Sequence, residues 1–170
     1  MKVRIRGCPE YKRFRPFIKK AVNYYSSQLI SDVRIRRNIE LLIKFSDKYD
    51  DIGTCCVEDY NTNNKARSFI IELKSDVGAS EILRTLAHEM VHMKQYVNGE
   101  LDAAMTVWRG NKIDSDKIDY YSQPWEMEAF AKEVGLFNHF CAKEKLWDIF
   151  KDIRNPQNKD HYPPKNIEWR

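Results

Sequence analysis

The stretch that decides the fold is Thr85-Leu86-Ala87-His88-Glu89-Met90-Val91-His92, which contains a His-Glu-x-x-His pattern. It holds two of the four histidines in the chain. On a helix, residues four apart lie on one face about 6 Å apart along the axis, so two imidazoles at that spacing reach one metal ion. Glu89 lies about 100° around the helix from His88, where its carboxylate can take a proton from the attacking water of a zinc hydrolase. The stretch therefore predicts a metal site with Glu89 as the general base.

The residues around this stretch favour a helix from about Ser80 to Asn98. Apolar side chains recur at three- and four-residue steps, at Leu83, Leu86, Met90, Met93 and Val97. This stripe faces nearly opposite the two histidines and Gln95, so one face packs on the body of the protein and the other looks into a cleft. Gly78 or Ser80 caps the start of the helix, and Gly99 ends it.

Length and composition indicate one globular domain spanning residues 1–170. The chain is 42% hydrophobic and 32% charged, as is typical of a soluble protein. No apolar run approaches a membrane span, and the N-terminal residues lack the apolar block of a signal peptide, so we expect a cytoplasmic protein without membrane contact. The four cysteines show no C-x-x-C spacing, which argues against a zinc knuckle or a disulfide framework.

Positive charge is concentrated at the N-terminal end of the chain. Residues 1–37 hold 11 Lys/Arg and two acids, a net charge of +9 within a chain total of +4. Such a basic segment can make weak contact with nucleic acid. The alternative is a solvated helix face with a basic arm at residues 1–15, and no recognised nucleic-acid motif favours the first interpretation.

The rest of the chain reads as helices and short strands. Alternating apolar residues predict strands over residues 39–45, 54–59 and 68–74, in addition to a short strand around Val3 and Ile5. Helical spacing predicts further helices over residues 16–30, from Pro124 to about Lys143, and briefly near residues 146–153. Residues 155–170 read as an extended tail. The order of helix, strands and helix favours an α+β fold.

This order and the His88-Glu89-x-x-His92 pattern resemble the zincin metallopeptidases. The run Thr85–His92 is similar to small phage-borne, SprT-like and ImmA-like members, and the resemblance covers about residues 35–140. It implies a zincin-like single domain, with a small, mostly antiparallel sheet packed on the active-site helix and a second helix that bears a ligand. It also implies one Zn²⁺ per chain, zinc metalloendopeptidase activity on a protein or peptide substrate, and, for a phage-encoded protein, the host cytoplasm. In zincins the sheet edge holds the substrate by strand addition, and we predict residues 68–74 as that edge.

A catalytic zinc site needs a third protein ligand besides two histidines. SprT-like proteins use a later histidine, but only His139 and His161 follow His92, and neither lies in a matching motif. Another branch uses a glutamate from a downstream helix. The stretch Trp125-Glu126-x-Glu128-Ala129 resembles the Glu-x-x-Ala pattern of ImmA-like peptidases, in which that glutamate binds the metal.

Two glutamates compete for the role of third ligand, Glu126 and Glu128. They point about 200° apart on a helix, so only one can face the site. Glu126 lies on the apolar side of its helix, where an unpaired carboxylate needs a cation, and we favour it. Glu128 stays the alternative, because Trp125-x-x-Glu128-Ala129 also resembles the Trp-x-x-Glu-Gly of other glutamate zincins.

Other residues are candidates for supporting roles. An Asp or Asn commonly follows the Ala of the ImmA-like pattern, whereas this chain has Phe130, so the acceptor for a ligand histidine must come from elsewhere. Glu133 lies on the same side and is expected to accept that hydrogen bond or to pair with an arginine. Tyr120 and Tyr121 are candidate oxyanion stabilisers, with simple packing as the alternative.

These observations favour a zinc-dependent metallopeptidase that hydrolyses peptide bonds. One alternative is a SprT-like protease acting on DNA-associated proteins, which the basic N-terminal segment would suit. The other is a catalytically silent, zinc-stabilised protein-binding module. Glu89 argues against the silent module, because a purely structural metal site has no use for a carboxylate beside the water position.

Overall fold

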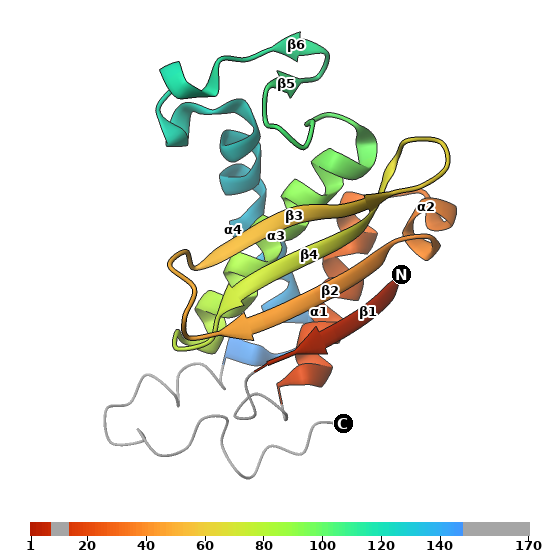
Figure 1. The fold of residues 1–170 in the computed structure, drawn as a ribbon. Helices are drawn as coiled ribbons and strands as arrows, with labels where there is room; N and C mark the ends of the chain where they lie inside the picture. Colours follow the sequence, from red (N-terminus) through yellow and green to blue (C-terminus); the bar gives the residue numbers. More distant parts are fainter. Residues whose placement is uncertain (8–13, 148–170) are drawn as a thin grey trace.

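The computed structural model describes residues 1–7 and 14–147, and it shows four strands with the long helices behind one face of their sheet (Figure 1). The strands of this sheet are β1 (Lys2–Arg6), β2 (Glu40–Ser46), β3 (Gly53–Tyr60) and β4 (Ala66–Lys74). The helices are α1 (Arg15–Leu29), α2 (Val33–Arg37), α3 (Ala79–Asn98) and α4 (Pro124–Lys143). A small hairpin of β5 (Val107–Trp108) and β6 (Asn111–Lys112) lies between α3 and α4 in the chain. The fold is α+β, as predicted.

The sheet is mixed and mostly parallel, so the predicted mostly antiparallel sheet is wrong. Its strand order is β1-β2-β4-β3, and β1–β2 and β2–β4 are parallel pairs, whereas β3–β4 is antiparallel. The chain between β1 and β2 contains α1, and a helical crossover returns the chain in the same direction. β4 then inserts between β2 and β3, where it runs antiparallel to β3 and parallel to β2. Alternation in the sequence predicts each strand but not its partner.

The edge strand next to α3 is β3, and the predicted edge at residues 68–74 is wrong. β4 pairs with strands on both sides and is therefore central, with Phe69, Ile71 and Leu73 fully buried. β3 lies at the end of the strand order and is mostly exposed along its second half. The alternation in residues 68–74 reports a buried face, and a central strand shows it more clearly than an edge strand does.

Helix α3 is buried on almost every side because it lies between the sheet and α4. Its apolar stripe, which was predicted to face the body of the protein, is buried at Leu83, Leu86, Met90, Met93 and Val97. The opposite side, with both histidines, faces α4. Gly99 ends the helix in the left-handed conformation with φ of 69°, as its place after Asn98 predicts. The sequence pattern therefore predicts the orientation of the histidine-bearing face correctly.

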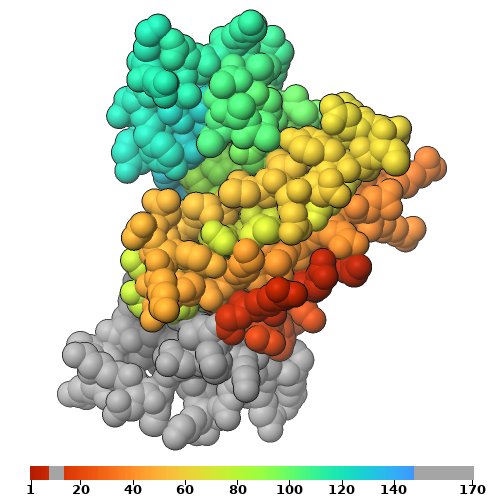
Figure 2. Space-filling model, in the orientation of Figure 1, coloured from red at the N-terminus to blue at the C-terminus, as the bar shows by residue number. Residues whose placement is uncertain are grey.

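The remaining predictions have mixed outcomes. The predicted 16–30 helix is confirmed as α1, but α2 was missed, because five residues rich in arginine carry no apolar stripe. Most of the predicted short helix near residues 146–153, the predicted extended tail and His161 lie outside the described residues. No helix in the described part of the chain is long and apolar enough to cross a membrane. In that same part, no helix covers the outer face of the sheet, which Figure 2 shows from the front.

Candidate metal centre

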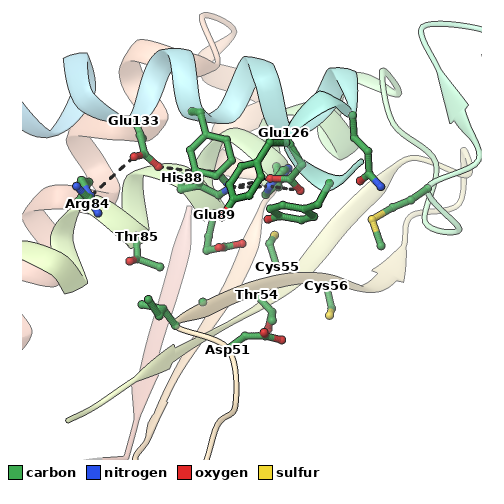
Figure 3. Close-up of a pocket in the computed structure, with 18 of the residues that line it drawn as sticks. Asp51, Thr54, Cys55, Cys56, Arg84, Thr85, His88, Glu89, Glu126 and Glu133 are labelled. Carbon is green, nitrogen blue, oxygen red and sulfur yellow. Dashed lines mark hydrogen bonds and ion pairs between the residues drawn. The ribbon is translucent and has the colours of Figure 1, made fainter. Parts of the chain in front are cut away.

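Two histidines from α3 and one glutamate from α4 meet in a buried group. His88 Nε2 lies 3.1 Å from Glu126 Oε2 and 3.1 Å from His92 Nε2, and His92 Nε2 lies 3.4 Å from Glu126 Oε1. The side chains come from different helices, but α3 and α4 pack directly on each other and bring them together (Figure 3). All three residues are buried, and one ligand atom from each lies within 4.8 Å of the others. The group could hold one metal ion.

The spacing of these groups is compatible with a tetrahedral zinc site. A Zn–N distance of about 2.0–2.1 Å at the tetrahedral angle separates neighbouring ligand atoms by about 3.3–3.4 Å. The two Nε2 atoms lie 3.1 Å apart, and each lies 3.1 or 3.4 Å from a different oxygen of the Glu126 carboxylate, which is close to that value. Two imidazoles and a carboxylate also form a ligand set that suits Zn²⁺ and leaves a fourth position for water.

The other ring nitrogen of each histidine is hydrogen-bonded in a way that determines its proton. His88 Nδ1 lies 2.8 Å from Glu133 Oε2, and a carboxylate only accepts, so Nδ1 donates. His92 Nδ1 lies 2.9 Å from Gln95 Oε1. The Gln95 amide nitrogen donates to the Trp125 carbonyl oxygen at 3.0 Å and to Glu128 at 3.1 Å, so its oxygen must face His92. Both Nδ1 atoms therefore carry protons.

As a result, three acceptors point at one another in the buried group. In a neutral imidazole with a protonated Nδ1, Nε2 carries a lone pair, and here both lone pairs face each other and the Glu126 carboxylate. Such an arrangement is unfavourable without a cation between the three atoms. A proton or a metal ion can supply that charge, and the triangle of donors accommodates the metal.

The shifted pKa values of His88 and Glu126 have the same cause, because positive charge is favoured between these side chains. Burial would lower the pKa of His88, but hydrogen bonds with Glu126 and Glu133 outweigh it and raise that pKa to about 9. Burial would raise the pKa of Glu126, but hydrogen bonds from His88 and His92 outweigh it and lower that pKa to about 2. In the absence of a metal, the carboxylate therefore stays charged and His88 holds a proton at neutral pH.

Glu89 lies between this group and strand β3 (Figure 3). Its side chain is buried, with 5% exposed, and burial raises its pKa to about 7 against the opposing effect of His92 and His88. The backbone of Gly53, the first residue of β3, comes so close that an added Cβ would lie 2.9 Å from Glu89 Oε1 and 2.4 Å from Thr85 Cγ2. Only glycine permits this approach. The one signal in the sequence for this approach was a glycine directly before the expected strand at residues 54–59.

The acceptor for His88 comes from Glu133, one turn beyond the position at which the resembled pattern has Asp or Asn. Glu133 also lies 3.8 Å from Arg84 Nε through its other oxygen, so both predicted contacts of this residue are present. At the expected position, the Phe130 ring instead lies edge-on to the His88 ring, with centroids 4.7 Å apart. The hydrogen-bond acceptor of His88 therefore lies about one turn further along α4 than in the resembled pattern, and the Phe130 ring contacts His88 from the position that the pattern gives to the acceptor.

Glu128 is turned away from the histidines and belongs to a separate ion network. Its carboxylate accepts from Lys94 at 3.0 Å and from Gln95 at 3.1 Å, and Lys94 also donates to Glu100 at 2.7 Å. Lys94 is 7% exposed, so these carboxylates neutralise a buried ammonium group. Because Gln95 contacts His92 as well, Glu128 supports that histidine indirectly. The sequence pattern did not predict this network, because Lys94 and Glu128 are brought together only by the packing of α3 on α4.

The two tyrosines before α4 are placed differently. Tyr120 lines the cleft with Glu126, and burial together with the nearby Glu126 carboxylate raises the pKa of Tyr120. Tyr121 is 68% exposed and rests its ring on Phe130, with centroids 5.5 Å apart. Tyr120 is therefore the more buried of the pair and lies near the Glu126 carboxylate. A role of either tyrosine in stabilising an oxyanion stays a prediction.

The group lies at the bottom of a cleft of about 790 Å³. Strand β3 forms one wall with Thr54, Cys55 and Cys56, and the segment around Tyr120 together with α4 forms the other (Figure 3). His139, the later histidine considered as a ligand, is exposed on α4 and does not line this cleft. Comparisons with protein-family models, with curated proteins and with solved structures find no match to this chain. What characterises the site is therefore its own donor set and surroundings.

Proposed function

We propose that this protein is a zinc-dependent metalloendopeptidase whose metal is held by His88, His92 and Glu126. The observation that carries the proposal is that the Nε2 atoms of His88 and His92 and the Glu126 carboxylate converge in a buried group. Both Nδ1 atoms hold the ring protons in their other hydrogen bonds, so neutral rings have no proton to place between the three acceptors. When bound, zinc polarises a scissile carbonyl and lowers the pKa of its bound water toward about 7. The proposal retains the zincin interpretation of the sequence and one Zn²⁺ per chain.

In this mechanism Glu89 acts as the general base. Its carboxylate lines the cleft beside the two histidines, and its pKa of about 7 suits a group that accepts and returns a proton near neutral pH. It takes a proton from the attacking water and delivers that proton to the leaving amine. Tyr120 is assigned the hydrogen bond to the developing oxyanion, because it lines the cleft together with Glu126 and its pKa is raised by burial and by that carboxylate.

The substrate in this proposal is an extended polypeptide bound along β3. Within the described residues β3 has a strand on one side only, so its other side offers backbone donors and acceptors beside the cleft. An added strand hydrogen-bonds through its backbone and so accepts many sequences. This assigns strand addition to residues 53–60 in place of the predicted 68–74.

Replacement of the general base tests the proposal. Zinc-loaded full-length protein is expected to cleave peptides, and Glu89→Gln to lower hydrolysis by about 100-fold or more while zinc content and melting temperature stay unchanged. Glu40→Gln, an exposed glutamate on β2 that pairs with Lys2 and Arg4, serves as the control and should cleave like wild type. Equal hydrolysis by Glu89→Gln and wild type would remove Glu89 from the mechanism.

The two alternatives have separate tests. A silent binding module would keep its zinc and cleave no peptide of a broad mixture. A protease acting on DNA-associated proteins would retain DNA at low salt and release it steeply as salt rises. The exposed arginines of α2, Arg34 and Arg37, would be the first residues to replace in that experiment.

A further inference from the structure

Three aromatic side chains stand exposed at the mouth of the cleft beside the metal-binding group. They are Tyr120, Tyr121 and Phe130, which are 50%, 68% and 37% exposed. The rings of Tyr120 and Tyr121 are 5.3 Å apart, those of Tyr121 and Phe130 are 5.5 Å apart, and Phe130 contacts the His88 ring at 4.7 Å. These three residues therefore form one aromatic cluster that touches a proposed ligand.

The cluster is part of a wider concentration of exposed apolar side chains. Among the described residues ten large hydrophobic side chains are substantially exposed, and half of these line the cleft: Ile52, Met105, Tyr120, Tyr121 and Phe130. The cleft is a small part of the surface, so this distribution is uneven. Contiguous exposed apolar surface in a concave site marks the place where a ligand buries apolar groups.

The charges of the cleft exclude an anionic ligand for the cluster. Five carboxylates line it, from Asp51, Glu81, Glu89, Glu126 and Glu133. Among the residues that line the cleft, Arg84 is the one arginine and there is no lysine, and Arg84 already pairs with Glu133. Aromatic rings can stack on nucleobases, but nucleic-acid binding needs cations along the phosphates, which this lining does not provide. An apolar side chain of a polypeptide fits both the rings and the charges.

We propose that the aromatic cluster is the binding subsite for a large apolar side chain, aromatic or of leucine size, next to the scissile bond. This inference rests on the proposed peptidase function and names its substrate class. A peptide that lies along β3 passes the metal-binding group, and the cluster lines the same cleft from α4 and the turn before it, where a side chain leaving the extended backbone can reach it. Phe130 occupies the place where the resembled pattern has a polar residue, so the preference is a property of this chain.

Cleavage of a peptide library by zinc-loaded full-length protein tests the subsite. Mass spectrometry of the products is expected to show Phe, Tyr, Trp, Leu or Met enriched at one position beside the cleaved bond. For a matched pair of peptides with Phe or Ala at that position, Phe130→Ala and Tyr121→Ala should lower kcat/KM for the Phe peptide about 10- to 100-fold. The ratio of kcat/KM for the Phe peptide to kcat/KM for the Ala peptide should fall by the same factor, whatever either substitution does to basal activity.

Val134→Ala is the matched control, because Val134 is 49% exposed on the same helix and does not line the cleft. It should keep the wild-type preference, and zinc content should match wild type in all three variants. A binding measurement separates the subsite from catalysis: zinc-loaded Glu89→Gln should bind a fluorescently labelled Phe peptide at least about tenfold more tightly than the Ala peptide.

The outcomes distinguish the two proposals. Cleavage without a preference for large apolar residues, or with a preference that persists in both Phe130→Ala and Tyr121→Ala, would overturn the subsite and leave the peptidase standing. Absence of cleavage with a retained binding preference would overturn the peptidase and keep the subsite. Equal affinity of Glu89→Gln for the two peptides would also overturn the subsite.

Discussion

Helices α3 and α4 both face the candidate metal centre, but they contribute to it in different ways. α3 supplies two donor atoms and Glu89 from one short pattern, and its surroundings are almost wholly protein. α4 supplies one donor, the acceptor for His88 and part of an exposed aromatic cluster, spread over two turns from Glu126 to Glu133. The candidate ligands and the proposed base on α3 are thus compact in sequence, whereas the supporting contacts and the proposed subsite are dispersed along α4.

The largest expected effect separates the two glutamates of α4. Glu126→Ala should reduce bound zinc to below about a tenth of a zinc per chain, because only two protein ligands remain. Glu128→Ala should keep most of its zinc but melt at a lower temperature, since it leaves the buried Lys94 with one carboxylate fewer. Zinc analysis and thermal unfolding of both variants measure this. If only Glu128→Ala loses zinc, the assignment of the third ligand is wrong.

A second variant examines the contact of α3 with β3. Gly53→Ala introduces a Cβ that would lie 2.4 Å from Thr85 Cγ2 and 2.9 Å from Glu89 Oε1, so the neighbouring atoms must shift, and we expect Glu89 to be displaced. Hydrolysis should fall about 100-fold, as expected for a catalytic group misplaced by about 1 Å, while zinc content remains that of wild type. Adding Thr85→Ser removes the nearer clash and should restore part of the activity.

Gly135→Ala is the control for this substitution, because nothing lies within 4 Å of the Cβ position at Gly135 in α4. It should stabilise the protein by up to about 1 kcal/mol through helix propensity and leave hydrolysis unchanged. Full activity of Gly53→Ala would show that β3 can shift without moving Glu89, and the close approach would then carry no functional weight.

The dispersed support on α4 is tested by Glu133→Gln. The amide keeps an oxygen for His88 Nδ1 but loses the charge that pairs with Arg84, so zinc affinity should fall about 10-fold, and Glu133→Ala should lose up to about 100-fold. Competition with a chelator of known affinity measures both. Unchanged zinc affinity in Glu133→Ala would mean that His88 is positioned by α3 alone.

The smallest expected effect, counted per pH unit, is the pH dependence of zinc affinity. The pKa of His88 is raised from 6.5 to about 9, and zinc must displace this proton, so affinity should rise about tenfold per pH unit toward pH 9. In the metal-free protein the same proton stabilises the fold. That stabilisation is complete below about pH 6.5 and is lost as pH rises through about 9. An affinity that levels off near pH 6.5 would show that His88 is not perturbed by Glu126 and Glu133.

The predictability of the molecule differs between its parts for physical reasons. α3 was predicted almost to the residue, because its caps, apolar stripe and histidine spacing all report the same helix. The sheet direction and its edge were predicted wrongly, because alternation reports which face is buried and not which strand is the neighbour. The orientation of Glu126 followed from helical projection. The approach of Gly53 to Glu89 and the pairing of Lys94 with Glu128 depend on tertiary packing and leave little local signal.

The metal centre is tested most directly by zinc titration of purified, metal-free full-length protein, with His88→Ala titrated beside it. The structure predicts one tight zinc per wild-type chain and a loss of tight binding in His88→Ala, because the two Nε2 atoms and the Glu126 carboxylate already lie close enough to share one ion. Wild-type protein that binds no zinc, or that binds it as tightly without His88, would contradict the metal centre and with it the proposed peptidase.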